Sequence, residues 1–328
     1  MIGAVNVIRG AVVGALALAI LFEVATIAVL YVVALLLGMG EVVADVALQV
    51  VLPQVVEDDQ LERANGRLFA AEIVANQFAG PPLGGLLFAV AAGLPMLVDS
   101  ATFVIGAVLV LSLGGTIRRR SPKVETDGIR AELAEGLRWL WRHRLLRTLA
   151  LLGAVMNGVW TAGFAVLALF ALDVLRIGNV GFGILLGASG VGYVIGSLGA
   201  AHLIASLPRA GVLVSAALSL VLVTIAIAVT SSAVVIGAAL LAYGFASAGW
   251  DVIAVTLRQR ETPDRLFGRV NSAYRFVQWG SMPLGAIMGG ALADAFGLRA
   301  PWVVGGALVV LATLGSLPAL RGSTTPDG

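Results

Sequence analysis

The chain lacks cysteine and has two histidines and a single lysine among its 328 residues. Without cysteine, disulfides, thiolate metal sites and cysteine nucleophiles are excluded. The phosphate-binding loop of an ATP-driven pump needs a Gly-Lys-Ser/Thr sequence. Here Lys123 follows Pro122, so the sequence contains no such ATP-binding site. His143 and His202 lie far apart and belong to no metal-ligand cluster. We therefore expect no metal, no cofactor and no nucleic-acid partner.

Charge is scarce as well. Charged residues make up 12% of the chain and apolar residues 59%, with a mean hydropathy of +0.99, whereas soluble domains have roughly 25% charged residues. A chain with this composition cannot fold as a single water-soluble domain. The N-terminus has no basic segment before its apolar run, which argues against a signal peptide. The composition predicts an all-α, polytopic membrane protein that is surrounded by lipid and is not an enzyme.

Long apolar runs define the predicted helices. A bilayer-spanning helix needs about 20 mostly apolar residues, and the sequence contains about ten such runs. They cover approximately residues 4–22, 27–51, 68–91, 95–114, 148–172, 180–205, 210–229, 233–257, 271–293 and 300–320.

The basic residues predict the orientation. If the runs cross the membrane in alternation, 19 of the 21 basic residues fall in or beside one set of connections, and Arg176 and Arg299 are the exceptions. Because basic residues are retained on the cytoplasmic side, both termini are expected there. One lysine against 20 arginines is typical of a GC-rich bacterial genome. We expect a multi-pass protein of a bacterial cell membrane.

The longest connection, residues 115–147, divides the runs into four and six. Its second part has Ile129, Leu133, Leu137, Leu140 and Trp141 at helical spacing, which predicts an amphipathic helix at the membrane surface over 128–147. The predicted organisation is a partial N-terminal half (1–114), this linker (115–147), a six-helix half (148–321) and a cytoplasmic tail (322–328).

The two halves contain an internal repeat. Residues 59–65 (DQLERAN) resemble residues 264–271 (DRLFGRVN), and the glycines at 80, 84 and 85 match those at 285, 289 and 290. The offset is 205 to 206 residues. Both copies begin in a connection of the same side, so this is a parallel repeat of the kind found between transporter halves.

The densest cluster of helix-breaking residues is Gly80-Pro81-Pro82-Leu83-Gly84-Gly85. Such a cluster would disrupt a soluble helix but is tolerated in a membrane bundle, where small residues also allow close helix packing. The elements Gly80, Pro81, Gly84 and Gly85 resemble the antiporter motif on the fifth helix of the major facilitator superfamily. Residues 257–271 resemble that family's loop between helices ten and eleven.

The resemblance covers essentially the whole chain and is closest to the branch of enterobactin exporters and macrolide efflux proteins. It implies proton-coupled export of a small amphipathic molecule (a drug, a macrolide or a siderophore-like compound) by alternating access. The family has twelve helices, so residues 1–114 correspond to helices 3–6 and the first two helices are expected to be missing. A truncated or degenerate membrane protein without transport activity is the alternative, and the antiporter motif disfavours an importer or uniporter.

Acidic residues inside the apolar runs are the candidates for coupling and gating, because a charge there costs ~2.5–3.5 kcal/mol to insert. Glu41, near the middle of its run, is the proton-carrier candidate. Asp45 and Asp251 are 206 residues apart and are predicted symmetry mates that form a cytoplasmic gate; a structural ion pair within each half is the alternative. Their predicted basic partners are Arg63, Arg67, Arg269 and Arg275.

Polar and aromatic residues deep in the runs are the candidates for substrate contact, because binding pockets combine apolar walls with a few polar groups. Interhelical packing is the alternative role for each. Gly183, Gly187, Gly192 and Gly196 are expected to pack the 180–205 helix against the Gly80 helix. The substrate-cavity candidates are Asn76, Gln77, Asn157, Trp160, Tyr193, Trp250 and Gln278.

Overall fold

The structure, a computed structural model, describes residues 2–22, 24–112, 129–263 and 265–321, and their regular secondary structure is entirely helical. Within these ranges, six helices are long and apolar enough to cross a membrane, and two further helical stretches are apolar but shorter. The predicted all-α membrane bundle is confirmed. The helices are α1 (Ile2–Leu21), α2 (Ile27–Val55), α3 (Leu61–Ile73), η2 (Val74–Ala79), α4 (Gly80–Val90), α5 (Leu94–Ser112), α6 (Ile129–Arg142), α7 (Arg144–Leu169), η4 (Phe170–Val174), α8 (Gly178–Ser206), α9 (Arg209–Val229), α10 (Ala233–Glu261), α11 (Phe267–Phe296) and α12 (Ala300–Arg321).

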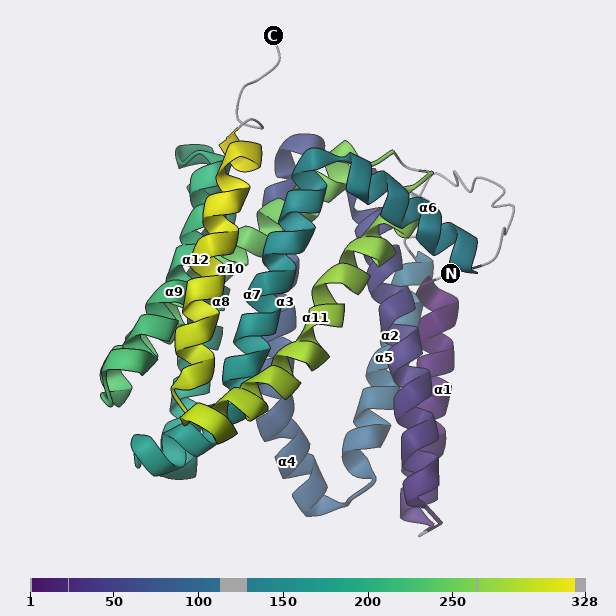
Figure 1. Cartoon of the computed structure of the whole chain (residues 1–328). Coiled ribbons are helices and arrows are strands. Elements are labelled where there is room, and N and C mark those ends of the chain that lie inside the picture. The colour runs from purple at the N-terminus through teal and green to yellow at the C-terminus, as the bar shows by residue number, and fades with distance from the viewer. Residues whose placement is uncertain (1, 23, 113–128, 264, 322–328) are drawn as a thin grey trace. The chain divides into compact units, whose positions relative to one another are not determined.

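The chain forms two compact units (Figure 1). The first comprises Met1–Leu61 and Ala75–Glu125 and contains α1, α2, α4 and α5; the second comprises Glu62–Val74 and Thr126–Gly328. The segment Glu62–Val74, assigned to the N-terminal half from the sequence, therefore groups with the C-terminal helices. The reason is local, since Asn65 Nδ2 donates hydrogen bonds to Thr256 Oγ1 (3.1 Å) and Gln259 Oε1 (2.9 Å) on α10.

The internal repeat has a structural counterpart. The bounds of α2 and α10 are offset by 206 residues at both ends, and α3 and α11, like α5 and α12, begin 206 residues apart. Within the first unit α1 packs against α2 and α5, and within the second α9 packs against α10 and α12. The same pattern of small and apolar residues thus produces the same local packing twice.

The Gly80–Gly85 stretch departs from the uninterrupted helix predicted over 68–91. The chain passes from α3 through the π-helical turn η2 into α4. Pro81 and Pro82 have no backbone N–H to donate, and a widened turn is a common way to accommodate such a defect. A Cβ added at Gly80 would lie 2.8 Å from the Ala75 carbonyl oxygen, so the widened turn requires a glycine there.

The amphipathic helix predicted over 128–147 forms as α6 but ends at Arg142. His143 then caps α7, because its Nδ1 accepts a hydrogen bond from the Leu146 backbone N–H (3.4 Å). The apolar face of α6 is buried, with Leu140 fully inaccessible. Gly136 lies directly against the backbone of Arg269, and α6 crosses the upper ends of α7 and α11 (Figure 1).

Close backbone contact joins α8 to α10 in the second unit. A Cβ added at Gly192 or Gly196 would overlap the backbone carbonyl of Leu241 or Phe245, whereas Gly183 and Gly187 have no neighbouring atom within 4 Å of that position. Within the second unit, Gly192 and Gly196 therefore pack on α10, and the predicted contact with the Gly80 helix stays a prediction. Only glycine permits so short a separation between two helix backbones.

These contacts predict different effects for two alanine substitutions on one helix. Gly196→Ala forces α8 and α10 apart and is expected to lower the free energy of unfolding by about 1–3 kcal/mol, the usual cost of overpacking. Gly187→Ala is the matched control, because its new methyl group meets no neighbour. Thermal unfolding of the purified protein in detergent measures both. Equal stability of the two variants would contradict the packing described here.

Candidate functional site

In α10, the charged residue nearest the middle of the helix is Asp251. It lies about 15 Å from the Glu261 end of the helix, at 1.5 Å per residue. Its Oδ2 accepts a hydrogen bond from the Tyr193 hydroxyl on α8 (2.7 Å), in a partly buried position. Tyr193 directly follows Gly192, so the close packing of α8 on α10 positions this hydroxyl. Asp251 and Tyr193, predicted separately as gate and cavity residues, belong to one pair.

A buried arginine follows Asp251 on the same face of α10. Arg258 lies seven residues further along, and residues seven apart share a helix face. Its side chain is 5% exposed, and its guanidinium carbon lies 3.9 Å from the centroid of the Tyr274 ring on α11. The Tyr274 hydroxyl accepts a hydrogen bond from Gln278 Nε2 (3.0 Å). A cation–π contact of this kind partly offsets the cost of removing the guanidinium from water.

Several cavity candidates gather where α7 meets α10 and α11. Gly153 on α7 lies against the amide of Gln278 and the ring of Trp250, which is itself buried in the core. Trp160 stacks on Tyr243, with 4.8 Å between ring centroids. The structure thus brings Gln278 and Trp250 together and places Trp160 in a separate aromatic contact. Asn157 is partly exposed on α7 and Asn76 is exposed.

A network of ion pairs lies in the second unit near the C-terminal end of α10, which finishes at Glu261. Glu62 on α3 lies 3.0 Å from Arg260 and 3.5 Å from Arg209, which joins α3 to α10 and α9. The neighbouring gate candidates Arg63 and Arg67 are exposed. Glu62 was not among the candidates from the sequence, because it lies between two predicted membrane helices rather than inside one.

Arg269 pairs with the linker helix. Its Nη2 lies 3.3 Å from Glu132 Oε1, and its Nη1 contacts Glu135 on the next turn of α6. The guanidinium of Arg275 lies 4.8 Å from the Trp279 ring. Arg269, predicted as a gate cation beside Asp251, is therefore held by two carboxylates of the amphipathic helix. The gate itself stays a prediction.

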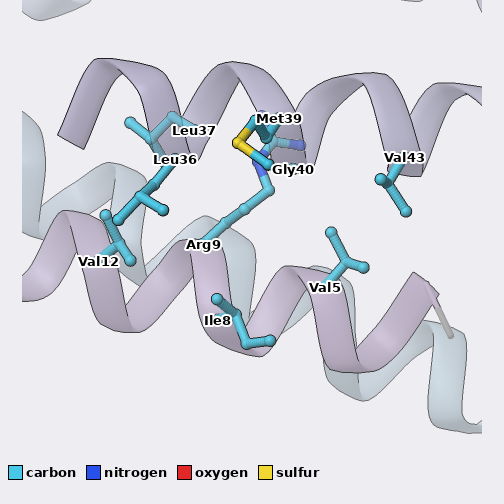
Figure 2. Close-up of a pocket in the computed structure, with 9 residues that line it drawn as sticks. All are labelled: Val5, Ile8, Arg9, Val12, Leu36, Leu37, Met39, Gly40 and Val43. Carbon is cyan, nitrogen blue, oxygen red and sulfur yellow. The ribbon is translucent and has the colours of Figure 1, made fainter. Parts of the chain in front are cut away.

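In the first unit, Glu41 on α2 has a 64% exposed side chain, and its Oε2 lies 4.0 Å from Arg9 Nη2 on α1. Figure 2 shows the Arg9 side chain extending from α1 towards Gly40 on α2, where an added Cβ would lie 2.9 Å from Arg9 Cγ. The sequence did not predict the pairing of Arg9 with Glu41, because spacing on one helix does not reveal a partner on another. Gly84 has open space around it. The side chains of Asp45, Gln77, Pro81 and Gly85 lie outside the described residues.

The chemistry available to these residues is non-covalent binding and proton exchange. Among the described residues, no group of three or more histidine, aspartate or glutamate side chains could hold a metal ion. The second unit offers a carboxyl group on a tyrosine hydroxyl, a guanidinium on an aromatic ring and a set of stacked aromatic side chains.

Comparison with solved structures identifies proteins of the same fold. A bacterial homologue of the iron transporter ferroportin in an outward-facing state aligns with a TM-score of 0.73 and 18% identity, over 96% of this chain and 80% of that one. The human organic anion transporter MFSD10 (TETRAN) aligns with a TM-score of 0.77 and 17% identity, over 95% of this chain and 76% of that one. A search of the curated proteins found no match.

The family model named Major Facilitator Superfamily matches residues 2–286, most of the chain. The helical fold, the paired repeat and this match agree with the resemblance in the Gly80 motif and in the loop after α10. The protein belongs to the major facilitator superfamily, and it is a multi-pass membrane protein of the transporter class.

Proposed function

We propose that the protein is a secondary active transporter that exports a small amphipathic molecule, such as a drug, a macrolide or a siderophore-like compound, in exchange for protons by alternating access. The observation that carries the coupling is the Asp251 carboxyl group, which lies mid-helix in α10 and is hydrogen-bonded to the Tyr193 hydroxyl at 2.7 Å.

A tyrosine hydroxyl suits a carboxyl group that changes protonation state. It can donate to an ionised carboxylate and can accept from a neutral carboxylic acid. An arginine in the same place could only donate. The Tyr193 partner therefore allows Asp251 to bind and release a proton while α8 and α10 keep their glycine-mediated contact. Asp251 joins Glu41, the candidate from the sequence, as a proton carrier to be tested.

Charged groups from two helices lie near the hydrogen-bonded pair. Arg258 on α10 interacts electrostatically with Asp251. Glu72 on α3 interacts electrostatically with Tyr193, so a second carboxyl group lies near the pair. The pair therefore has one basic and one acidic group nearby, and its hydroxyl is compatible with either protonation state of Asp251.

The amphipathic character of the substrate is supported by the side chains around α7. Trp160 and Tyr243 provide stacked aromatic surface, and Gln278 provides an amide beside Gly153. This combination of apolar walls and few polar groups is typical of small-molecule sites. Export rests on the antiporter motif at Gly80–Gly85, and a cell-membrane location with both termini in the cytoplasm rests on the basic residues. An iron transporter homologue and an organic anion transporter share the fold, so the fold leaves the substrate open.

Proton coupling can be measured with the purified protein in liposomes, with ethidium and erythromycin as probes. Asp251→Asn is expected to abolish transport driven by a pH gradient but to retain exchange of probe at equal pH, because asparagine still accepts from Tyr193 but cannot carry a proton. Asp294→Asn is the control, since Asp294 is an exposed acid near the far end of α11. Glu41→Gln is tested in parallel.

Each outcome of this experiment is informative. Loss of gradient-driven transport in Glu41→Gln with normal transport in Asp251→Asn would move the proton site to Glu41. Normal gradient-driven transport in both variants would contradict proton coupling through either acid. Failure of the wild-type protein to move either probe would support a family member without this transport activity.

The hydrogen bond between Tyr193 and Asp251 can be tested by a double-mutant cycle. Tyr193→Phe and Asp251→Ala each remove the interaction, so their effects on the free energy of unfolding should be non-additive by about 0.5–3 kcal/mol. Ser189→Ala combined with Asp251→Ala is the control cycle. The Ser189 hydroxyl donates to its own helix at Leu186 O (2.8 Å), so additive effects are expected there. Additivity in the Tyr193 cycle would remove the structural basis of the proposed proton site.

A further inference from the structure

Both acidic residues of the linker helix α6 contact another helix of the second unit. Glu132 Oε1 lies 3.3 Å from Arg269 Nη2 on α11, and Glu135 contacts Nη1 of the same guanidinium. Gly136, on the same side of α6, lies against the Arg269 backbone. The negative charge of α6 is therefore placed on the side that packs on α11, where Arg269 compensates part of it.

The exposed face of α6 carries only positive charge among its described side chains. The exposed residues recur every three to four positions, which places them on one face of the helix. None of the ion pairs in the described part of the chain involves Arg138 or Arg142. The pairing of both acids with Arg269 thus leaves an uncompensated cationic face. Its residues are Ala131, Ala134, Arg138, Trp141 and Arg142.

This face reaches the boundary of the membrane at the start of α7. The apolar span of α7 begins at Arg144, which is exposed and forms no ion pair in the described ranges. Leu151, seven residues further along the same face of α7, is 45% exposed. Trp141, just before the boundary, is 44% exposed. Tryptophan and arginine side chains are favoured at the level of the lipid headgroups, so we name Arg138, Trp141, Arg142 and Arg144 the interfacial patch.

The backbone between α6 and α7 is held in place by three contacts. His143 stacks on Trp139, with 5.1 Å between ring centroids, and its Nδ1 accepts from the Leu146 backbone N–H at 3.4 Å. Arg147 Nη1 donates to the Trp141 carbonyl oxygen at 3.0 Å. The residues on either side of His143 are therefore presented from a fixed turn rather than from a free loop.

We propose that the interfacial patch binds an anionic phospholipid, with the phosphodiester on the guanidinium groups and the acyl chains along the exposed apolar face of α7. A guanidinium matches the oxygens of a phosphate in a bidentate geometry, and basic residues beside a membrane helix attract anionic lipids. The interaction surface goes beyond the transport proposed above and does not depend on it.

The apolar part of the surface favours a lipid over a soluble acidic partner. A soluble polyanion would contact the arginines and leave Trp141 and Leu151 without a partner, whereas a phospholipid presents a phosphate and a hydrocarbon chain in the same order as the patch and α7. A zwitterionic phospholipid contains the same phosphate but also a cationic group, which the uncompensated arginines repel. The sign of the patch therefore selects an anionic headgroup.

Native mass spectrometry of the delipidated full-length protein in a neutral detergent measures this binding. Dioleoyl phosphatidylglycerol is the probe, dioleoyl phosphatidylcholine is the zwitterionic comparison, and glycerol 3-phosphate is the soluble competitor. We expect tighter binding of phosphatidylglycerol than of phosphatidylcholine, and no competition by glycerol 3-phosphate at the same concentration. Arg142→Gln and Arg144→Gln should each weaken phosphatidylglycerol binding about fivefold, the effect of one basic residue near a lipid surface.

Arg176→Gln is the matched control for these variants. Arg176 is also exposed, but it follows the opposite end of the apolar span that begins at Arg144. Its substitution removes the same charge and should leave phosphatidylglycerol binding unchanged. Equal binding by Arg142→Gln, Arg144→Gln and Arg176→Gln would overturn the proposal, as would equal affinity of the wild-type protein for the two phospholipids.

A substitution that adds charge separates lipid binding from folding. Ala134→Glu places a carboxylate four residues before Arg138, an arrangement that stabilises a helix, so this variant should fold normally and bind phosphatidylglycerol more weakly. Ala134→Gln has the same size without the charge and should bind like the wild-type protein. Equal binding by these two variants would contradict the proposal. Competition by glycerol 3-phosphate at the concentration of the lipid would also overturn it, because the occupant would then be a soluble anion.

Discussion

A charged side chain inside the hydrocarbon of a bilayer has no water to solvate it and depends on partners from neighbouring helices. Asp251 accepts from a tyrosine hydroxyl, and Arg258 lies over an aromatic ring. Arg9 lies over Phe103 but keeps a buried Nε without an acceptor. Arg258 Nε is likewise buried without a hydrogen-bond partner in the described part of the chain, so each aromatic contact offsets only part of the cost of burying its guanidinium. A hydroxyl group or an aromatic ring on a neighbouring helix thus replaces part of the lost solvation of each of these three groups.

Glycine provides the geometry that makes these partnerships possible. The backbones of α8 and α10 approach closely at Gly192 and Gly196, which places the adjacent Tyr193 within reach of Asp251. In the first unit, Gly40 leaves room for the stem of Arg9. In the absence of a hydrophobic driving force between membrane helices, close packing of small residues is a main source of helix association. The same residues that hold the helices together therefore also position the polar groups.

The two copies of the repeat share their helix bounds but differ in their polar contacts. Asn65 in the first copy donates to Thr256 and Gln259 on α10. Asn271, which matches it in the second copy, is fully buried, and neither side-chain amide atom has a hydrogen-bond partner in the described ranges. Likewise, the Gly-Pro-Pro stretch produces a π-helical turn before α4, whereas α11 continues as an α-helix through its single Pro283. Sequence symmetry therefore fixes the elements without fixing the environment of each residue.

Hydropathy and helical spacing alone determined the membrane bundle, the positions of its helices and the repeat, because those properties depend on local composition and on the thickness of the bilayer. The tertiary structure decided which side chains meet. The pairing of Asp251 with Tyr193, the contact of Arg269 with the linker helix and the approach of Arg9 to Gly40 each join residues from different helices. Periodicity specifies which face of a helix a residue occupies, but the partner on that face is set by how closely and in which register two helices pack.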